Sequence, residues 1–166
     1  TGAGGSIGSE LCRQVAGFKP KQLILLGSGE NSIYEIEIEM QSRFPKLEIH
    51  PIICNIQDRT RLEQVFTQYK PDVVFHAAAH KHVPLMELNP PEAIKNNIFG
   101  TMNVAECALC CKTKQFIFIS TDKAINPASV MGISKRISEL IIECIAKDNS
   151  TKFSIVRFGN VLVSRG

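Results

Sequence analysis

Short apolar runs rich in β-branched and aromatic residues alternate along the chain with longer segments in which apolar residues recur every three to four positions. Runs of the first kind are typical of strands buried in a parallel sheet, and segments of the second kind are typical of helices packed on a sheet. The pattern predicts strands at 22–27, 48–54, 72–79, 115–120 and 153–158. It predicts helices at 6–16, 32–43 and 59–69, a fourth after Asn89 and a last from about Ser134. This alternation indicates an α/β fold with a doubly wound parallel sheet.

Composition adds constraints on size, partners and location. A chain of 166 residues buries one sizeable core, so we expect one domain or a piece of one. The 19 basic and 16 acidic residues are scattered, which argues against a nucleic-acid surface but leaves a phosphate-bearing ligand open. The six cysteines come without a signal-peptide pattern or a long apolar run. This favours reduced thiols, a cytoplasmic location and no membrane contact within this segment.

The pattern of cysteines and histidines predicts no metal site. The cluster at 107–111 lacks the matching second pair that a zinc site needs. His76 closes a predicted strand, and His80 and His82 follow it without an obvious acidic partner. Loop and supporting roles are therefore the favoured interpretation for these histidines.

The segment TGAGGSIGSEL at the start of the chain carries the first candidate site. Gly2, Gly5 and Gly8 form a Gly-x-x-Gly-x-x-Gly pattern at the entrance to the predicted helix, which begins with Ser6 and Ile7. Glycine there permits a tight turn and lets backbone N–H groups approach a pyrophosphate, which the helix dipole also favours. In an alternating α/β chain this favours a Rossmann-type NAD or NADP site over a plain glycine turn.

Further cofactor contacts are expected at the carboxyl ends of the next strands. Gly27 stands where an NAD site usually has a carboxylate for the ribose, which permits NADP, while Glu30 nearby leaves NAD open. Asn55 or Asp58 is either an adenine contact or a turn residue, and Ile56 beside them is expected to contact the cofactor. Three small residues let backbone pass close to a cofactor, namely Ala77, Ala78 and Ala79.

The chain opens directly on the glycine-rich loop, with no apolar run before it. A loop of this kind normally follows a strand, which in this topology lies centrally, between the strands at 22–27 and 72–79. We therefore expect residues 1–166 to be a fragment that lacks its first strand and the C-terminal substrate subdomain. Because two strands would lose their ladder partner, we expect the isolated fragment to be poorly stable and inactive.

The segment FIFISTDKAINPASVMGISKR carries the second candidate site. Ser120, Thr121, Asp122 and Lys123 follow one another where a predicted strand ends, a position at which α/β enzymes carry reactive side chains. A capping pair in an ordinary loop is the alternative for Asp122 and Lys123. Four functional groups in a row favour the catalytic interpretation.

Met131 and Lys135 lie one helical turn apart, so both are expected to face one pocket. In the short-chain dehydrogenase/reductase superfamily this spacing is Tyr-x-x-x-Lys, and the tyrosine transfers a proton. Methionine transfers no proton. In an enzyme of that kind, the acid and the base must therefore come from other residues.

Five segments together resemble one protein family. They are TGAGGSIGSEL, HAAAHKHVPLMELNP, NNIFGT, STDKAINPASVMGISKR and RFGNVLVSRG. The family is the bacterial polysaccharide-biosynthesis family of UDP-N-acetylglucosamine 4,6-dehydratases, which are extended short-chain dehydrogenases/reductases. The resemblance covers residues 1–166, about the first half of that family's catalytic domain with its NAD(P)-binding part, and Met131 fits a methionine-for-tyrosine subgroup.

The resemblance implies a hydride cycle without net redox change on a UDP-sugar. Bound NAD or NADP would take hydride from C4, water would be lost across C5 and C6, and hydride would return to C6. By similarity Lys123 would be the base at C5, Asp122 the acid for the C6 hydroxyl, and Thr121 a hydrogen-bond partner of the C4 oxygen. Further contacts carried over are Lys135 for the nicotinamide ribose, Asn97 for the cofactor, and Lys81, Asn160 and Arg165 for the substrate.

Three departures from the family pattern concern cofactor choice and pocket size. They are Gly27, Asn55 in place of an aspartate, and Val163 in place of a small residue. Two rival functions remain open, an epimerase or reductase of the same superfamily, and a non-catalytic NADP-binding module. The resemblance also leaves open a homo-oligomer and an anchor at the inner face of the cell membrane for the parent protein.

Overall fold

A computed structural model of the chain describes residues 1–148 and 151–161. The strands are β1 (Gln22–Gly27), β2 (Glu48–Ile53), β3 (Val73–His76), β4 (Gln115–Thr121) and β5 (Lys152–Phe158). The first helices are α1 (Ser6–Gly17), α2 (Glu30–Arg43), α3 (Arg59–Tyr69), α4 (Val83–Leu88) and α5 (Pro90–Ala93). They are followed by the π-helix η1 (Ile94–Gly100), α6 (Thr101–Cys110), the 3₁₀ helix η2 (Asp122–Ala124), α7 (Val130–Ile145) and the 3₁₀ helix η3 (Ala146–Asp148).

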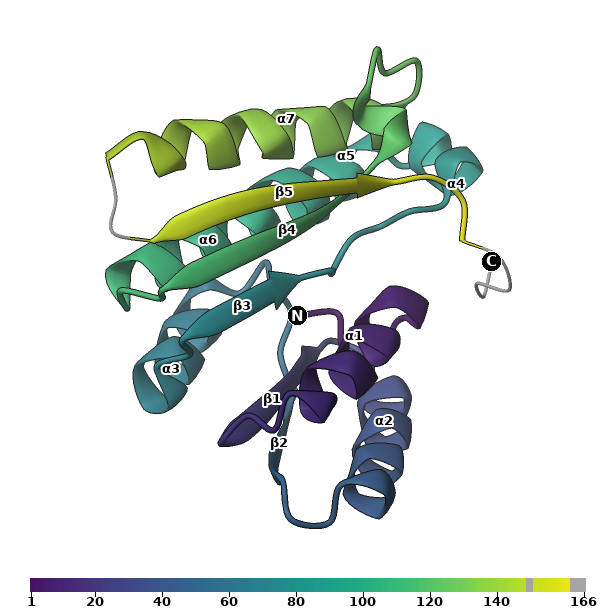
Figure 1. Cartoon of the computed structure of the whole chain (residues 1–166). Coiled ribbons are helices and arrows are strands. Elements are labelled where there is room, and N and C mark those ends of the chain that lie inside the picture. Colours follow the sequence, from purple (N-terminus) through teal and green to yellow (C-terminus); the bar gives the residue numbers. More distant parts are fainter. Residues whose placement is uncertain (149–150, 162–166) are drawn as a thin grey trace.

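All the paired strands are parallel, as the alternating pattern predicts. β1 pairs with β2, and β3, β4 and β5 pair in that order in a second group. Figure 1 shows α1 and α2 beside β1 and β2, while α6 and α7 run along β4 and β5. The predicted α/β class with Rossmann-like parallel strands is confirmed, and the sheet is in two parts.

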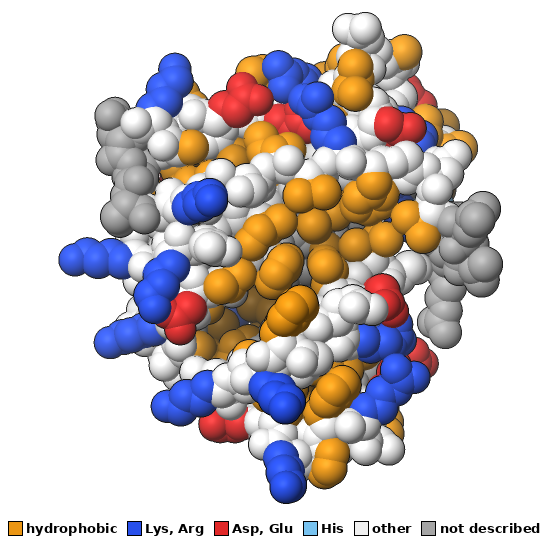
Figure 2. All heavy atoms as spheres, viewed as in Figure 1, with side chains coloured by type: hydrophobic (Ala, Val, Ile, Leu, Met, Phe, Trp, Pro, Cys, Tyr) orange, Lys and Arg blue, Asp and Glu red, His pale blue; other side chains and the backbone are white. Residues whose placement is uncertain are grey.

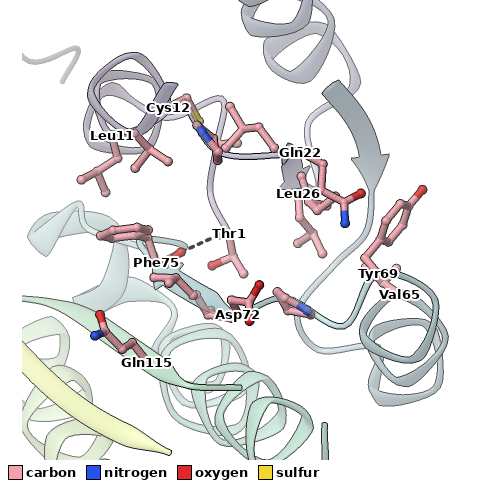
Figure 3. Close-up of a pocket in the computed structure, with 18 of the residues that line it drawn as sticks. Thr1, Leu11, Cys12, Gln22, Leu26, Val65, Tyr69, Asp72, Phe75 and Gln115 are labelled. Atoms are coloured by element: carbon pink, nitrogen blue, oxygen red, sulfur yellow. Dashed lines mark hydrogen bonds between the residues drawn. The ribbon is translucent and has the colours of Figure 1, made fainter. Parts of the chain in front are cut away.

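The first residues of the chain join the two parts of the sheet. The Ala3 N–H donates to the Leu26 carbonyl of β1 at 3.1 Å, and the Ala77 N–H donates to the Thr1 carbonyl at 3.1 Å. The Thr1 nitrogen also donates to the Phe75 carbonyl at 2.7 Å (Figure 3). Beside this link lies a hollow of about 570 Å³, lined mainly by apolar side chains of α1, β1, α3 and β3. It lies between β1 and β3.

The core forms on the helix-covered face of β3, β4 and β5, because alternate strand residues point to opposite faces. Phe116 and Phe118 of β4 are fully buried there with Val104 of α6 and Ile142 of α7. The alternate positions are more open, and Val156 of β5 is 44% exposed. Figure 2 shows hydrophobic side chains gathered across one face of the molecule and around the hollow.

Three local details differ from the sequence prediction. The strand predicted at 72–79 ends at His76, because Ala77 leaves β4 and pairs with Thr1. The last helix begins at Val130 rather than near Ser134, because the Ser129 side chain caps it by accepting a hydrogen bond from the Gly132 N–H at 3.1 Å. The short helix α4 was not predicted.

The described residues contain no helix that is long and apolar enough to cross a membrane. Over the same ranges, 1–148 and 151–161, no three His, Cys, Asp or Glu side chains are grouped so as to hold a metal ion. All six cysteines are free thiols.

Candidate active site

Two close backbone approaches shape the glycine-rich loop. Gly2 has a φ of +71°, and a Cβ atom on it would lie 2.7 Å from the Ala78 nitrogen. A Cβ atom on Gly8 would lie 1.9 Å from the Gly2 carbonyl oxygen, which accepts a hydrogen bond from the Gly5 N–H at 3.0 Å. Both positions therefore require glycine. The loop has the features of the backbone cradles that bind phosphate groups.

The amino-terminal end of α1 adds a favourable field for an anion. Gly5 is the N-cap residue and provides no side-chain hydrogen bond, and the first turn carries no acidic residue. The positive end of the helix dipole is therefore not neutralised by side chains of the helix itself. This part of the predicted cofactor site is built from backbone groups.

A pocket of about 280 Å³ adjoins the glycine-rich loop. It brings together most of the cofactor residues predicted from the first segment and from HAAAHKHV. Its lining is Gly2, Gly5, Ser6, Ile7, Gly8, Ala77, Ala79, His80, Lys81, His82, Leu85 and Met86. Ala78 lies against Gly2 and packs on the core. The predicted substrate residue Lys81 thus shares a pocket with the predicted cofactor loop.

The residues predicted near the adenine and ribose have structural roles in the chain. The Asn55 side chain accepts a hydrogen bond from the Gln57 N–H at 2.9 Å, and the Asp58 side chain caps α3. Ile56 is 3% exposed and packs in the core, so a cofactor contact at that position would come from its backbone. Gly27 ends β1, where a Cβ atom would press against α2. Cofactor contacts by Asn55 and Ile56 stay predictions.

His76 supports the glycine-rich loop through a hydrogen bond to Thr1. The histidine is fully buried, with Nδ1 2.6 Å from the Thr1 hydroxyl and Nε2 2.9 Å from the Thr101 hydroxyl. Burial lowers the pKa of His76 well below its usual value, and the nearby Lys135 cation lowers it further. The ring is therefore neutral at physiological pH and acts as a hydrogen-bonding link between the loop and α6.

Asn97 supports the pocket through its hydrogen bonds to His80, one of the lining residues. Its side chain is 1% exposed and accepts a hydrogen bond from the His80 N–H at 2.8 Å. Its amide nitrogen donates to the His80 carbonyl at 3.0 Å and to the Ser134 hydroxyl at 2.9 Å. Because these groups are used within the protein, Asn97 acts on the pocket by fixing the loop after β3. The direct cofactor contact expected for it stays a prediction.

The last residue of β4 and the two residues after it form a compact polar cluster with Asn160, the second residue after β5. The Thr121 hydroxyl donates to Asp122 Oδ1 at 2.9 Å. Lys123 Nζ donates to Asp122 Oδ1 at 3.3 Å and to Asn160 Oδ1 at 2.9 Å. Hydrogen bonds from Thr121 and Lys123 lower the pKa of Asp122 from its usual value. The structure thus brings together three of the four predicted catalytic residues and one predicted substrate residue.

Lys135, the fourth predicted catalytic residue, lies apart from these contacts. It is 5% exposed, its Nζ donates to the Ile119 carbonyl at 2.8 Å, and it lies 3.9 Å from the centre of the Phe118 ring. Burial lowers the pKa of Lys135 to about 7, although the Glu139 carboxylate opposes this change. Lys135 therefore titrates near neutral pH.

Met131 does not share an open pocket with Lys135, contrary to the prediction from their spacing. Its side chain is 5% exposed and packs with Met86 and Ala93. Arg136, the residue after Lys135, pairs with Glu139 at 2.9 Å. Met131 contributes packing behind the pocket that Met86 lines.

Glu139 is a residue that the sequence did not single out. It is 0% exposed and binds Ser120, Arg136 and Arg157. The available signal was a carboxylate four residues after Lys135, and so on the same face of the last helix as that lysine. Two other predictions, a substrate contact by Arg165 and the departure at Val163, lie outside the described residues.

Comparison with known proteins places this geometry in context. The pattern of the family described as "Polysaccharide biosynthesis protein" matches residues 1–166. The probable polysaccharide biosynthesis protein EpsC of Bacillus subtilis is 59% identical over the whole chain, which corresponds to 28% of that protein. A UDP-N-acetylglucosamine 4,6-dehydratase (inverting) of Campylobacter jejuni is 36% identical over the whole chain and 49% of its own length.

A solved structure is also similar over nearly the whole chain. The crystal structure of Pen from Bacillus thuringiensis matches with a TM-score of 0.89 and 34% identity, over 99% of this chain and 52% of that one. The chain thus spans about half the length, or less, of the proteins that it matches.

Proposed function

The chain belongs to the polysaccharide biosynthesis protein family, and from this premise we propose that the protein carrying it is a nucleotide-sugar 4,6-dehydratase. Its substrate would be UDP-N-acetylglucosamine and its product would enter surface polysaccharide or glycan synthesis. The observation that carries the proposal is the cluster in which Lys123 Nζ contacts Asp122 at 3.3 Å and Asn160 at 2.9 Å. It offers an acid and a base at strand ends, in a chain whose methionine cannot replace the tyrosine of related enzymes.

NAD or NADP fits the glycine-rich loop. A Cβ atom at Gly2 or at Gly8 would collide with neighbouring backbone, so the two glycines permit the tight turn at the start of α1 whose N–H groups suit a pyrophosphate. When bound, the oxidised nicotinamide supplies hydride transfer, from C4 of the sugar and later back to C6. Lys135 is the candidate for the nicotinamide ribose, and Gly27 at the end of β1 leaves the choice between NAD and NADP to experiment.

Asp122 and Lys123 divide the elimination between them. The Lys123 amine takes the C5 proton of the 4-keto sugar, and the Asp122 carboxyl gives a proton to the C6 hydroxyl, which departs as water. Thr121 hydrogen-bonds the C4 oxygen. The elimination forms the C5–C6 double bond, and C6 then receives the hydride while C5 is reprotonated. Lys123 returns its proton to C5, and the proton that the C4 hydroxyl releases on oxidation replaces the one that Asp122 gives to the departing water.

The lowered pKa of Asp122 is compatible with its role as an acid. The Asp122–Lys123 ion pair and the neutral pair hold the same single proton and differ only in which group carries it. The two side chains are 53% and 40% exposed, so a bound sugar would cover them and exclude water. Exclusion of water disfavours the two charges and favours the neutral pair. In the neutral pair the lysine is a base and the carboxyl group is an acid. The close contact of the two side chains therefore favours the protonation state that the elimination needs.

Substrate contacts are proposed for Lys81, Asn160 and Arg165. The guanidinium of Arg165 suits a diphosphate because its donors can be bidentate. We also propose that the catalytic part of the protein works in the cytoplasm, where nucleotide sugars are used, and that the whole protein forms a homo-oligomer.

The test uses the full-length protein that carries this chain, incubated with UDP-N-acetylglucosamine and analysed by mass spectrometry and NMR. We expect a 4-keto-6-deoxy product that has lost one water. Lys123→Ala should form this product far more slowly, while Lys112→Ala, a lysine change on the turn after α6, should form it at the normal rate. A stereoisomer of the substrate with unchanged mass would instead identify an epimerase. Cofactor binding without turnover of any UDP-sugar would favour a non-catalytic module.

A further inference from the structure

A buried carboxylate ties together three elements next to the proposed catalytic cluster. Glu139 of α7 is 0% exposed. It accepts hydrogen bonds from the Ser120 hydroxyl of β4 at 2.6 Å and from Arg157 of β5, through Nε at 2.8 Å and Nη2 at 2.7 Å. Arg136 Nη1 donates a further bond at 2.9 Å. A fully buried glutamate is rare unless it is paired, and here both oxygens are used.

The strand register places this carboxylate where two segments of the cluster begin. We call these segments, 120–123 and 157–160, the two arms. Ser120 and Arg157 are directly paired in the β4–β5 ladder, one rung before its last pair, Thr121 and Phe158. Lys123 lies three residues after Ser120, and Asn160 lies three residues after Arg157. The two arms meet again where Lys123 Nζ donates to Asn160 Oδ1 at 2.9 Å. The two arms thus form a small closed loop with Glu139 at one end and the Lys123–Asn160 contact at the other.

The helix is attached to β4 at two consecutive residues. Lys135 Nζ donates to the Ile119 carbonyl at 2.8 Å, and Glu139, one turn later, binds Ser120. Apolar packing alone would hold α7 against the strands without choosing this register, because dispersion contacts have little directionality. Charge-assisted hydrogen bonds to a bidentate arginine fix orientation as well as distance.

We propose that Glu139 is a positioning residue of the active site: it sets the ends of β4 and β5 so that Lys123 and Asn160 meet. This inference rests on the proposed function only in that Lys123 is taken as the base. Glu139 contacts neither substrate nor cofactor in this assignment. It acts through Ser120 and Arg157.

The test compares two substitutions on α7 in the full-length protein. Glu139→Gln keeps the shape and removes the charge that the two arginines share. Glu143→Gln is the matched control, because Glu143 lies one turn later, is 50% exposed and contacts the same Arg136 at 3.5 Å. We expect Glu139→Gln to lower kcat about 10- to 100-fold with KM changed less than about threefold, as misplacement of a reacting group predicts. Glu143→Gln should leave both constants near those of the unchanged protein.

Hydrogen–deuterium exchange gives a readout that does not depend on the reaction. In Glu139→Gln, peptides covering 119–125 and 156–161 should exchange faster, while the glycine-rich loop at 1–8 should not change. If Glu139→Gln keeps its kcat, or exchanges faster only within 130–145, the positioning role is overturned.

Two further results separate this inference from the proposed function. If the unchanged protein does not dehydrate UDP-N-acetylglucosamine, the proposed function fails, and the exchange experiment still decides whether Glu139 orders the two arms. If Glu139→Gln does not fold, Ser120→Ala replaces it, since it removes one bond to the carboxylate and leaves the arginine pair. We expect the same direction of change there, with a smaller loss of kcat, and an unchanged kcat would overturn the proposal.

Discussion

Gly8→Ala tests the cofactor loop with the smallest possible addition of atoms. The new Cβ would lie 1.9 Å from the Gly2 carbonyl oxygen, whereas contacts under 3.0 Å are essentially never seen for real Cβ atoms. The loop or the start of α1 must therefore move by at least about 1.1 Å. A displacement of about 1 Å in a pre-organised site lowers the rate of a reaction there on the order of 100-fold. We expect the Kd for the dinucleotide to rise by about that factor, or about 2.7 kcal/mol.

The assay is isothermal titration of the full-length protein with NAD and, separately, with NADP. The strain should also lower the free energy of unfolding by about 1–3 kcal/mol, measured by denaturant titration. Gly17→Ala is the matched control, because it ends the same helix and its Cβ would meet nothing within 4 Å. It should bind the dinucleotide normally and gain up to about 1 kcal/mol of stability. If the two variants bind the dinucleotide equally well, the glycine-rich loop is not the pyrophosphate site.

Three further predictions concern Lys123, Glu139 and Met131. Lys123→Ala should lower turnover by about 10²- to 10⁴-fold while dinucleotide binding stays unchanged, and turnover within threefold of normal would exclude Lys123 as the base. Burial would raise the pKa of Glu139, but hydrogen bonds from Arg157, Ser120 and Arg136 outweigh it and lower that pKa from 4.5 to about 2. The Glu139 carboxylate therefore contributes about 3 kcal/mol to the free energy of unfolding above pH 4.5, and this contribution is lost as the pH falls toward 2. Urea titrations at several pH values should show this loss, and the free energy of unfolding of Glu139→Gln should depend less on pH. Met131→Tyr should lower the free energy of unfolding by about 1–3 kcal/mol without raising turnover, because Met131 packs with Met86 and Ala93 in the interior. Thermal unfolding checks the loss of stability and a turnover assay checks the activity. An increased turnover would contradict the prediction.

Several features could be predicted because they depend on local pattern. The strand at 22–27 was predicted with its observed bounds, since a buried parallel strand is a continuous apolar run. Gly2 and Gly8 could be identified because glycines at this spacing before a helix are typical of a tight, phosphate-binding turn. The start of α7 was placed four residues too late, because the Ser129 cap is decided by one hydrogen bond rather than by periodicity.

Other features depend on residues far apart in the sequence. Lys123 and Asn160 are 37 residues apart and meet only because β4 and β5 are adjacent and in register. The structure also shows that the side chains of Asp122 and Lys123 contact each other at 3.3 Å. A sequence pattern contains neither the register nor the side-chain orientation that decides such contacts.

By itself the sequence determined the alternating α/β class, the glycine-rich loop and the run of polar groups at the end of β4, because each depends on residue type and short spacing. Only the tertiary structure decided that Asn97 supports a loop, that Met131 packs in the interior, and that a buried glutamate joins the two strand ends. The physical reason is that these roles depend on which groups become buried together. A buried carboxylate or amide must find its partners within the protein, and those partners are chosen by the packing of strands and helices.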